Sequence, residues 1–268
     1  MVKLIVSDLD DTLLTDKLTI SQADMDAIAQ AQAQGMIFTI ATGRMFVATL
    51  PFAKQLGLPP ERPIICYNGA VVQSVSGQVV YENPIRHELA LDIVEYCTSQ
   101  GWTTNVYYHD ALYVSEINSD VEYYLSFAEV PTYPVGNLGE FLKEERKAPP
   151  KILIISPEEL NSTRQNLLVE RYGQDTQIVQ SKRRYLEITS ADAHKASALE
   201  WVVQKLGITM GEVLAIGDSN NDVEMLRRAG IGVAVANAVP AAKTAADYIA
   251  ASNSEGGVAE AIRRYALV

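Results

Sequence analysis

Short apolar runs at 3–6, 36–41 and 63–67 alternate with helical segments at 21–34 and 43–55. Runs without polar alternation are typical of strands that are buried on both faces, as in a parallel sheet covered by helices. The order strand, helix, strand, helix, strand therefore predicts an α/β fold: a Rossmann-like, doubly wound parallel sheet with right-handed crossovers.

A different pattern occupies the middle of the chain, where hairpins mix with helices. The strands there are predicted at 71–75, 78–82, 103–108, 111–116, 151–155, 176–181 and 185–189, and the helices at 87–100 and 157–172. The parallel pattern returns at 213–216 and 232–236. We therefore predict a discontinuous core domain, 1–83 and 187–268, and an inserted α+β domain at 84–186.

Two capping-box patterns predict where helices begin. Ser21 and Asp24 fit the first pattern, and Gly35 suits the C-terminal end of the same helix. Ser156 and Glu159 fit the second pattern, with Pro157 expected at the first helical position.

The net charge limits the partners of the chain. A formal charge of −11 in 268 residues disfavours nonspecific binding to nucleic acid or to an anionic membrane. The N-terminal apolar run is too short for a signal peptide, and no run approaches the roughly 18 residues that span a bilayer. Cys66 and Cys97 lack metal-ligand spacing, so we interpret them as reduced, buried thiols of a cytoplasmic protein. The sequence leaves the oligomeric state open.

Asp8 and Asp10 follow the first strand directly, in Asp8-Leu9-Asp10-Asp11-Thr12. Ligands of doubly wound sheets bind at the carboxyl ends of strands. Side chains two residues apart in an extended segment point the same way, and two close carboxylates repel each other unless they share a cation or a proton. The segment therefore predicts a cation site or, as the alternative, an acidic helix N-cap.

Asp218, Asn221 and Asp222 follow the strand at 213–216 and bring more oxygen ligands to the same edge, although alone they also fit a helix cap. Oxygen-rich sites suit Mg²⁺, which commonly engages the phosphate groups of substrates. Taken with Asp8 and Asp10, the segment predicts a magnesium site that binds phosphate.

Two further segments can hold a phosphate. Thr42 offers a hydroxyl at the end of the second strand, and Gly43 lets backbone N–H groups approach an oxyanion at the start of the next helix. A plain turn is the alternative. Lys195 precedes an amphipathic helix and can neutralise phosphoryl oxygens, although a single lysine in such a place commonly faces solvent.

In chain order, Asp8-x-Asp10-x-Thr12, Thr42-Gly43-Arg44, Lys195 and Gly217-Asp218-x-x-Asn221-Asp222 resemble the four motifs of the haloacid dehalogenase-like phosphatases. The set spans both ends of the chain. It is most similar to the Cof-type branch, whose members carry a large α/β cap where the inserted domain lies here. Further segments like those of that branch are Tyr67-Asn68-Gly69-Ala70, Leu186-Glu187-Ile188, Val235-Ala236-Asn237-Ala238 and Glu255-Gly256-Gly257-Val258. One departure is Asp192-Ala193-His194-Lys195-Ala196, because branch members usually have glycine beside the lysine.

The resemblance implies a magnesium-dependent phosphatase, that is, a phosphoric monoester hydrolase. Asp8 would attack phosphorus to form an aspartyl-phosphate, and Asp10 would serve as general acid and base. The implied metal-binding residues are Asp8, Asp10 through its carbonyl, Asp218 and Asp222, the last of them directly or through water or Lys195. The implied phosphate- and substrate-binding residues are Leu9, Asp11, Thr42, Gly43, Arg44, Asn68, Lys195 and Asn221.

By the same resemblance, the substrate would be a small phosphorylated metabolite such as a sugar phosphate, flavin mononucleotide or pyridoxal phosphate. We expect the inserted domain to add specificity. Its candidates are Tyr107, Tyr108, His109, Arg183 and Arg184, with core packing or solvation as the alternative for each.

Other functional classes remain open at this point. A sugar phosphomutase would use the same aspartyl-phosphate, and a receiver-like signalling domain would accept a phosphoryl group without turnover. A dinucleotide-binding protein is disfavoured because no G-x-G-x-x-G follows the first strand.

Overall fold

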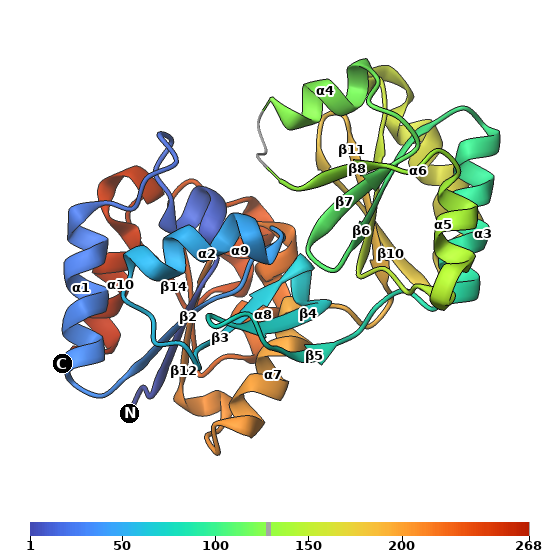
Figure 1. Cartoon of the computed structure of the whole chain (residues 1–268). Helices are drawn as coiled ribbons and strands as arrows, with labels where there is room; N and C mark the ends of the chain where they lie inside the picture. Colours follow the sequence, from blue (N-terminus) through green and yellow to red (C-terminus); the bar gives the residue numbers. More distant parts are fainter. Residues whose placement is uncertain (127–129, 268) are drawn as a thin grey trace. The chain divides into compact units, whose positions relative to one another are not determined.

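The computed structural model describes residues 1–126 and 130–267. The chain divides into two compact units, drawn in Figure 1. We call Met1–Tyr81 together with His194–Val268 the core unit, and Glu82–Ala193 the inserted unit. The predicted boundary at 186/187 falls within β11 (Tyr185–Ser190), which pairs with two strands of the inserted unit.

The core unit is built on a parallel sheet with the strand order β14-β13-β12-β1-β2 in the described ranges. Its strands are β1 (Leu4–Ser7), β2 (Ile37–Ile40), β12 (Val213–Gly217), β13 (Ile231–Ala234) and β14 (Tyr248–Ile249). Ser7 pairs with Ile216 on one side and with Ile40 on the other, so β12, β1 and β2 end at the same edge. The predicted α/β class is confirmed.

Helices cover both faces of this sheet, with α1 and α10 together on one face and α7 and α8 on the other (Figure 1). The helices of the core unit are α1 (Gln22–Ala33), α2 (Phe46–Gln55), α7 (Lys195–Lys205), α8 (Val223–Arg228), α9 (Pro240–Ala245) and α10 (Gly257–Tyr265). Ser21 caps α1 as predicted, because its hydroxyl accepts a hydrogen bond from the backbone N–H of Asp24 at 3.1 Å.

The third predicted strand does not belong to the parallel sheet. β3 (Pro63–Cys66) pairs antiparallel with β4 (Val71–Ser74), and β5 (Val79–Glu82) completes this small sheet. An isolated bridge between Ala41 and Ile65 links it to the end of β2. The prediction failed because the apolar run of β3 also fits a strand that pairs with the hairpin following it.

The second helix begins later than predicted. α2 starts at Phe46, not at Gly43, because Met45 has an extended backbone and occupies the N-cap position. Residues 42–45 therefore form a loop, in which the backbone N–H of Arg44 donates to the hydroxyl of Thr42 at 3.1 Å.

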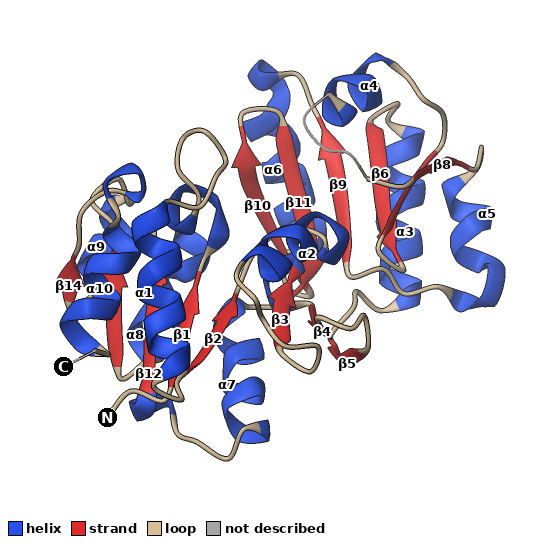
Figure 2. Ribbon diagram, turned by 60° about the vertical axis from the view of Figure 1, so that its left-hand side comes forward, coloured by secondary structure: helices blue, strands red, loops and turns tan. Residues whose placement is uncertain are grey.

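The inserted unit has a sheet with the order β10-β11-β9-β6-β7-β8 in the described ranges, antiparallel except between β7 and β8. Figure 2 shows β10, β11, β9 and β6 side by side. Its strands are β6 (Thr103–Tyr108), β7 (Ala111–Val114), β8 (Thr132–Pro134), β9 (Lys151–Ile155), β10 (Thr176–Lys182) and β11. Its helices are α3 (His87–Ser99), α4 (Ser119–Leu125), α5 (Leu138–Lys143) and α6 (Glu158–Tyr172). Its apolar core includes Ile93, Val106, Ile152, Leu168 and Leu186, all fully buried.

Several details of the inserted unit differ from the predictions. The capping box at Ser156 is wrong: Pro157 is the N-cap of α6, and the buried Ser156 hydroxyl has no hydrogen-bond partner among the described residues. The sequence patterns also missed α4, α5 and β8, since elements this short show too little periodicity to detect.

Two expectations from composition concern the whole chain. Cys66 and Cys97 are both fully buried. Between residues 1 and 126 and between 130 and 267, the structure contains no helix with the length and apolar character needed to cross a membrane.

Candidate active site

Strand ends and one helix start bring the candidate residues together in the core unit. Asp8 follows β1, Thr42 follows β2, and Asp218 follows β12. The backbone N–H of Asp8 donates to the carbonyl of Ile216 at 2.9 Å, which keeps two of these loops side by side. β1 is where the chain order of the sheet reverses, the usual ligand-binding edge of such folds.

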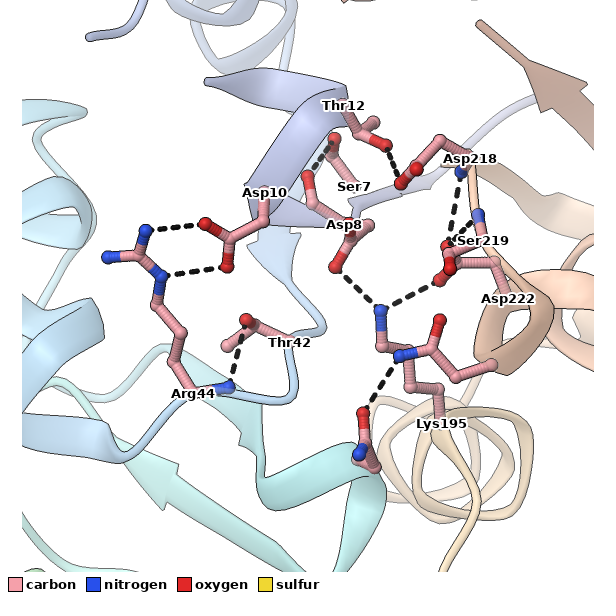
Figure 3. A network of polar contacts seen from close by, with 12 residues as sticks. Ser7, Asp8, Asp10, Thr12, Thr42, Arg44, Lys195, Asp218, Ser219 and Asp222 are labelled. Atoms are coloured by element: carbon pink, nitrogen blue, oxygen red, sulfur yellow. Dashed lines mark hydrogen bonds and ion pairs between the residues drawn. The ribbon is translucent and has the colours of Figure 1, made fainter. Parts of the chain in front are cut away.

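A lysine lies between two of the acids (Figure 3). The Nζ atom of Lys195 is 2.6 Å from Oδ1 of Asp8 and 2.8 Å from Oδ1 of Asp222. The side chains of Lys195 and Asp222 have no exposed surface, and that of Asp8 is only 7% exposed. The solvent-facing alternative for Lys195 is therefore wrong, because α7 begins at this residue and directs it inward.

The second oxygen of Asp222 holds the loop after β12. Its Oδ2 accepts the backbone N–H groups of Asp218 and Ser219 at 3.1 and 3.0 Å. A Cβ on Gly217 would lie 2.6 Å from the Cβ of Asp222, so only glycine fits there. Because one oxygen contacts Lys195 and the other accepts these two N–H groups, Asp222 fixes Lys195 relative to the loop that carries Asp218.

Thr12 connects the first acidic loop to the second. Its hydroxyl donates to Oδ1 of Asp218 at 2.8 Å, and Thr12 is fully buried. The sequence-based set of binding residues omitted Thr12, although its place in the first motif was the available signal.

The charges of this cluster do not balance. One oxygen each of Asp8, Asp218 and Asp222 can be chosen so that all three lie within 4.8 Å of one another. Burial raises the pKa of Asp8 well above its ordinary value, against the lowering effect of Lys195. Burial and the carboxylate of Asp222 raise the pKa of Asp218 to about 6. Three carboxylates against one ammonium leave two negative charges, so the donor set fits a divalent cation that prefers oxygen ligands.

Asp10 itself has an extended backbone, with φ of −73° and ψ of 134°, but it does not continue the strand that leads to Asp8. Residues 9–13 form a helical turn in which Asp11 adopts a left-handed conformation with φ of 56°. The carboxylate of Asp10 instead faces Arg44, whose Nε donates to its Oδ2 at 2.8 Å (Figure 3). A second contact joins the Arg44 guanidinium to Oδ1 at 2.5 Å. Arg44 thus holds the general acid and base inferred from the resemblance.

A small cluster of amides lies beside Thr42. The side-chain amide of Asn221 donates to Oδ1 of Asn68 at 2.9 Å. Asn68 has a left-handed backbone with φ of 57°, and a Cβ on Gly43 would lie 2.8 Å from its Oδ1. The structure thus brings Gly43, Asn68 and Asn221 together, and glycine permits the close approach.

The remaining candidates occupy different surroundings. Leu9 is fully buried, and Asp11 is exposed. In the inserted unit, Tyr107 is buried and its hydroxyl donates to that of Tyr124 at 2.9 Å. Arg184 forms an ion pair with Asp120 at 2.5 Å, so its charge is already balanced within the unit.

Comparison with known proteins identifies the family. Residues 5–262 match the haloacid dehalogenase-like hydrolases. The chain belongs to this family. The predicted membership is therefore confirmed, and so is the prediction of an enzyme that hydrolyses phosphoric monoesters, because relatives in this family are named as phosphatases.

Relatives within the family match this hydrolase over nearly its whole length. The 5-amino-6-(5-phospho-D-ribitylamino)uracil phosphatase YcsE of Bacillus subtilis is 30% identical over 99% of this chain and 96% of its own. A solved structure from Thermotoga maritima is 31% identical, with a TM-score of 0.88 over 98% of this chain and 97% of that one. A haloacid dehalogenase-like hydrolase from Bacteroides thetaiotaomicron is 30% identical, with the same TM-score over 98% and 99%.

Proposed function

We propose that this hydrolase removes phosphate from a small metabolite with the help of Mg²⁺, through an aspartyl-phosphate on Asp8. The observation that carries the proposal is the buried contact of Asp8 with Lys195, 2.6 Å from Nζ to Oδ1, beside the carboxylate of Asp218. A carboxylate at a strand end, next to a cation that can also hold phosphoryl oxygens, is placed for nucleophilic attack on phosphorus.

The first step forms the phosphoenzyme. An oxygen of the Asp8 carboxylate bonds to phosphorus, and the bond from phosphorus to the ester oxygen breaks with its electron pair on that oxygen. Asp10 gives its proton to this oxygen, which leaves as an alcohol. In the second step a water oxygen bonds to phosphorus, Asp10 takes the water proton, and the bond from phosphorus to Asp8 breaks.

Other residues of the core unit would hold the phosphoryl oxygens. Lys195 supplies a buried positive charge, and Thr42 supplies a hydroxyl that is also fully buried. We propose that the backbone N–H groups of Leu9 and Gly43 also donate to the phosphoryl oxygens. Asp11, Asn68 and Asn221 are proposed as further phosphate- or substrate-binding residues. We propose that Arg44 holds the carboxylate of Asp10 in position, because its Nε donates a hydrogen bond to that carboxylate in the structure.

Mg²⁺ would be held by the carboxylates of Asp8 and Asp218 and by the carbonyl of Asp10, with Asp222 behind them. When bound, such an ion supplies charge stabilisation to the transferring phosphoryl group. Lys195 and Asp222 do not need to move for this, because they already hold Asp8 and the backbone of Asp218 in place.

The proposed substrate class rests on the named substrate of a relative. YcsE is named for a phosphorylated ribityl compound, and we propose phosphorylated sugars, sugar alcohols and phosphorylated cofactors for this chain. We also propose the cytoplasm as its location, in keeping with two buried thiols.

A panel of such compounds tests the function. Phosphate release is measured with and without Mg²⁺, for the wild-type chain and for Asp8→Asn. We expect release from at least one compound, dependent on Mg²⁺ and absent in the variant. An isomerised sugar phosphate in place of free phosphate would point to a mutase. A lasting phosphoenzyme without turnover would point to a receiver-like domain, and either outcome contradicts the proposal.

Asp10→Asn is expected to separate the two steps. We expect turnover of alkyl phosphates to fall by about 10²- to 10⁴-fold, because the leaving oxygen and the attacking water lose their proton partner. With 4-nitrophenyl phosphate, whose leaving group needs little protonation, phosphoenzyme should accumulate and be visible by mass spectrometry after an acid quench. Asp26→Asn, an exposed change on α1, is the matched control. Normal turnover in Asp10→Asn would contradict the role.

A further inference from the structure

The loop after β13 contacts the turn that follows Asp8. The side-chain amide of Asn237 donates to the backbone carbonyl of Asp11 at 2.7 Å. The Oδ1 of Asn237 accepts the backbone N–H of Asn253 at 3.0 Å. The side chain of Asn237 therefore bridges the backbone N–H of Asn253 and the backbone carbonyl of Asp11.

Asn253 secures the far end of the same turn. Its side-chain amide donates to the carbonyl of Leu14 at 2.9 Å and lies 3.2 Å from Oδ1 of Asp16. Asn253 is only 3% exposed, so these hydrogen bonds are sheltered from water. The two asparagines therefore fix both ends of the segment from Asp11 to Leu14.

The same loop also reaches the second acidic segment. The backbone N–H of Val239 donates to the carbonyl of Asp218 at 2.8 Å. Residues 237–239 thus join the loop that carries Asp8 to the loop that carries Asp218, in addition to the link that Thr12 makes.

The conformation of Asp11 explains why such support matters. A left-handed backbone is unfavourable for residues other than glycine, although aspartate tolerates it better than most. The hydrogen bond from Asn237 ends on the carbonyl of this residue, directly after Asp10. Relaxation of Asp11 would rotate the peptide that sets the direction of the Asp10 side chain.

We propose that Asn237 is a positioning residue for Asp10. It fixes the left-handed turn at Asp11, with Asn253 as its anchor, and so keeps the carboxylate of Asp10 where it can protonate the leaving group. This inference rests on the proposed function, in which Asp10 is the general acid and base.

The test compares two substrates in Asn237→Ala. One is an alkyl phosphate hydrolysed by the wild type, and the other is 4-nitrophenyl phosphate, whose departure needs little help from an acid. Both kcat/KM values cover the step in which the leaving group departs. We expect the value for the alkyl phosphate to fall by roughly five- to tenfold more than that for the aryl phosphate, the effect of one hydrogen bond.

Two further variants make the result specific. Asn237→Asp loses the donor to Asp11 and keeps an acceptor for Asn253, so we expect the same selective loss. Asn166→Ala, an exposed change on α6, should leave both values unchanged. The ratio of the two values does not depend on how much of the variant is folded.

The outcomes distinguish the two proposals. Equal losses on both substrates, or no loss, in the Asn237 variants would overturn the positioning role while leaving the proposed function intact. If the wild type hydrolyses neither substrate, or if Asp8→Asn retains activity, the proposed function fails first and the positioning role fails with it.

Discussion

Asp8→Asn is expected to lose at least about 10³-fold in phosphate release on every substrate of the wild type. Removal of a covalent nucleophile has effects of this size or larger, because binding and electrostatics alone replace little of its contribution. The amide has nearly the shape of the carboxylate and is neutral. Lys195 keeps its second partner, the carboxylate of Asp222 at 2.8 Å, so the variant should fold.

Three measurements make this result interpretable. Thermal unfolding reports whether the variant is folded, and mass spectrometry reports whether the new asparagine has deamidated back to aspartate. Acid-quenched protein is then examined for a covalent phosphoryl group, which we expect in the wild type and not in the variant. Full activity in protein that has not deamidated would contradict the assignment of Asp8.

Lys195→Met is expected to affect stability and activity together. The side chain of Lys195 is fully buried and balances the carboxylates of Asp8 and Asp222. Breaking a buried ion pair by removing one partner costs about 3–5 kcal/mol, since the remaining charge is buried without compensation. We expect the free energy of unfolding, measured in urea, to fall by that amount, and phosphate release to fall by at least about 10²-fold.

Lys205→Met is the matched control, because it makes the same change on the exposed end of the same helix. It should leave stability and turnover nearly unchanged. A Lys195→Met protein with wild-type stability would show that the contacts to Asp8 and Asp222 contribute little. Wild-type turnover would show that Lys195 does not serve the phosphoryl group.

The sequence predicted which acids meet, because parallel strands place their carboxyl ends at one edge. Asp8 and Asp218 follow neighbouring strands, and the structure brings them together with Asp222 as this rule requires. Helix caps and apolar runs similarly located α1, α3 and most strands. These features depend on local residue patterns, which a single sequence displays directly.

The supporting contacts could not be predicted in the same way. Arg44 pairs with Asp10, and the next residue, Asp11, has a left-handed backbone for which an aspartate gives no unambiguous signal. The inward direction of Lys195 depends on where α7 begins. β3 lies outside the parallel sheet because it pairs with β4. The hydrophobic pattern does not distinguish this pairing from one within the parallel sheet.

The central strand of the core sheet has a consequence for how the enzyme is made. β1 is paired with β12, and Thr12 bonds to a residue 206 positions away in the chain. A growing polypeptide that ends before Lys195 carries Asp8 but lacks its ammonium partner, the second acidic loop and the strands β12, β13 and β14. Contacts of such long sequence separation form late and slowly. The cluster of Asp8, Lys195, Asp218 and Asp222 therefore assembles only after these last three residues have been synthesised.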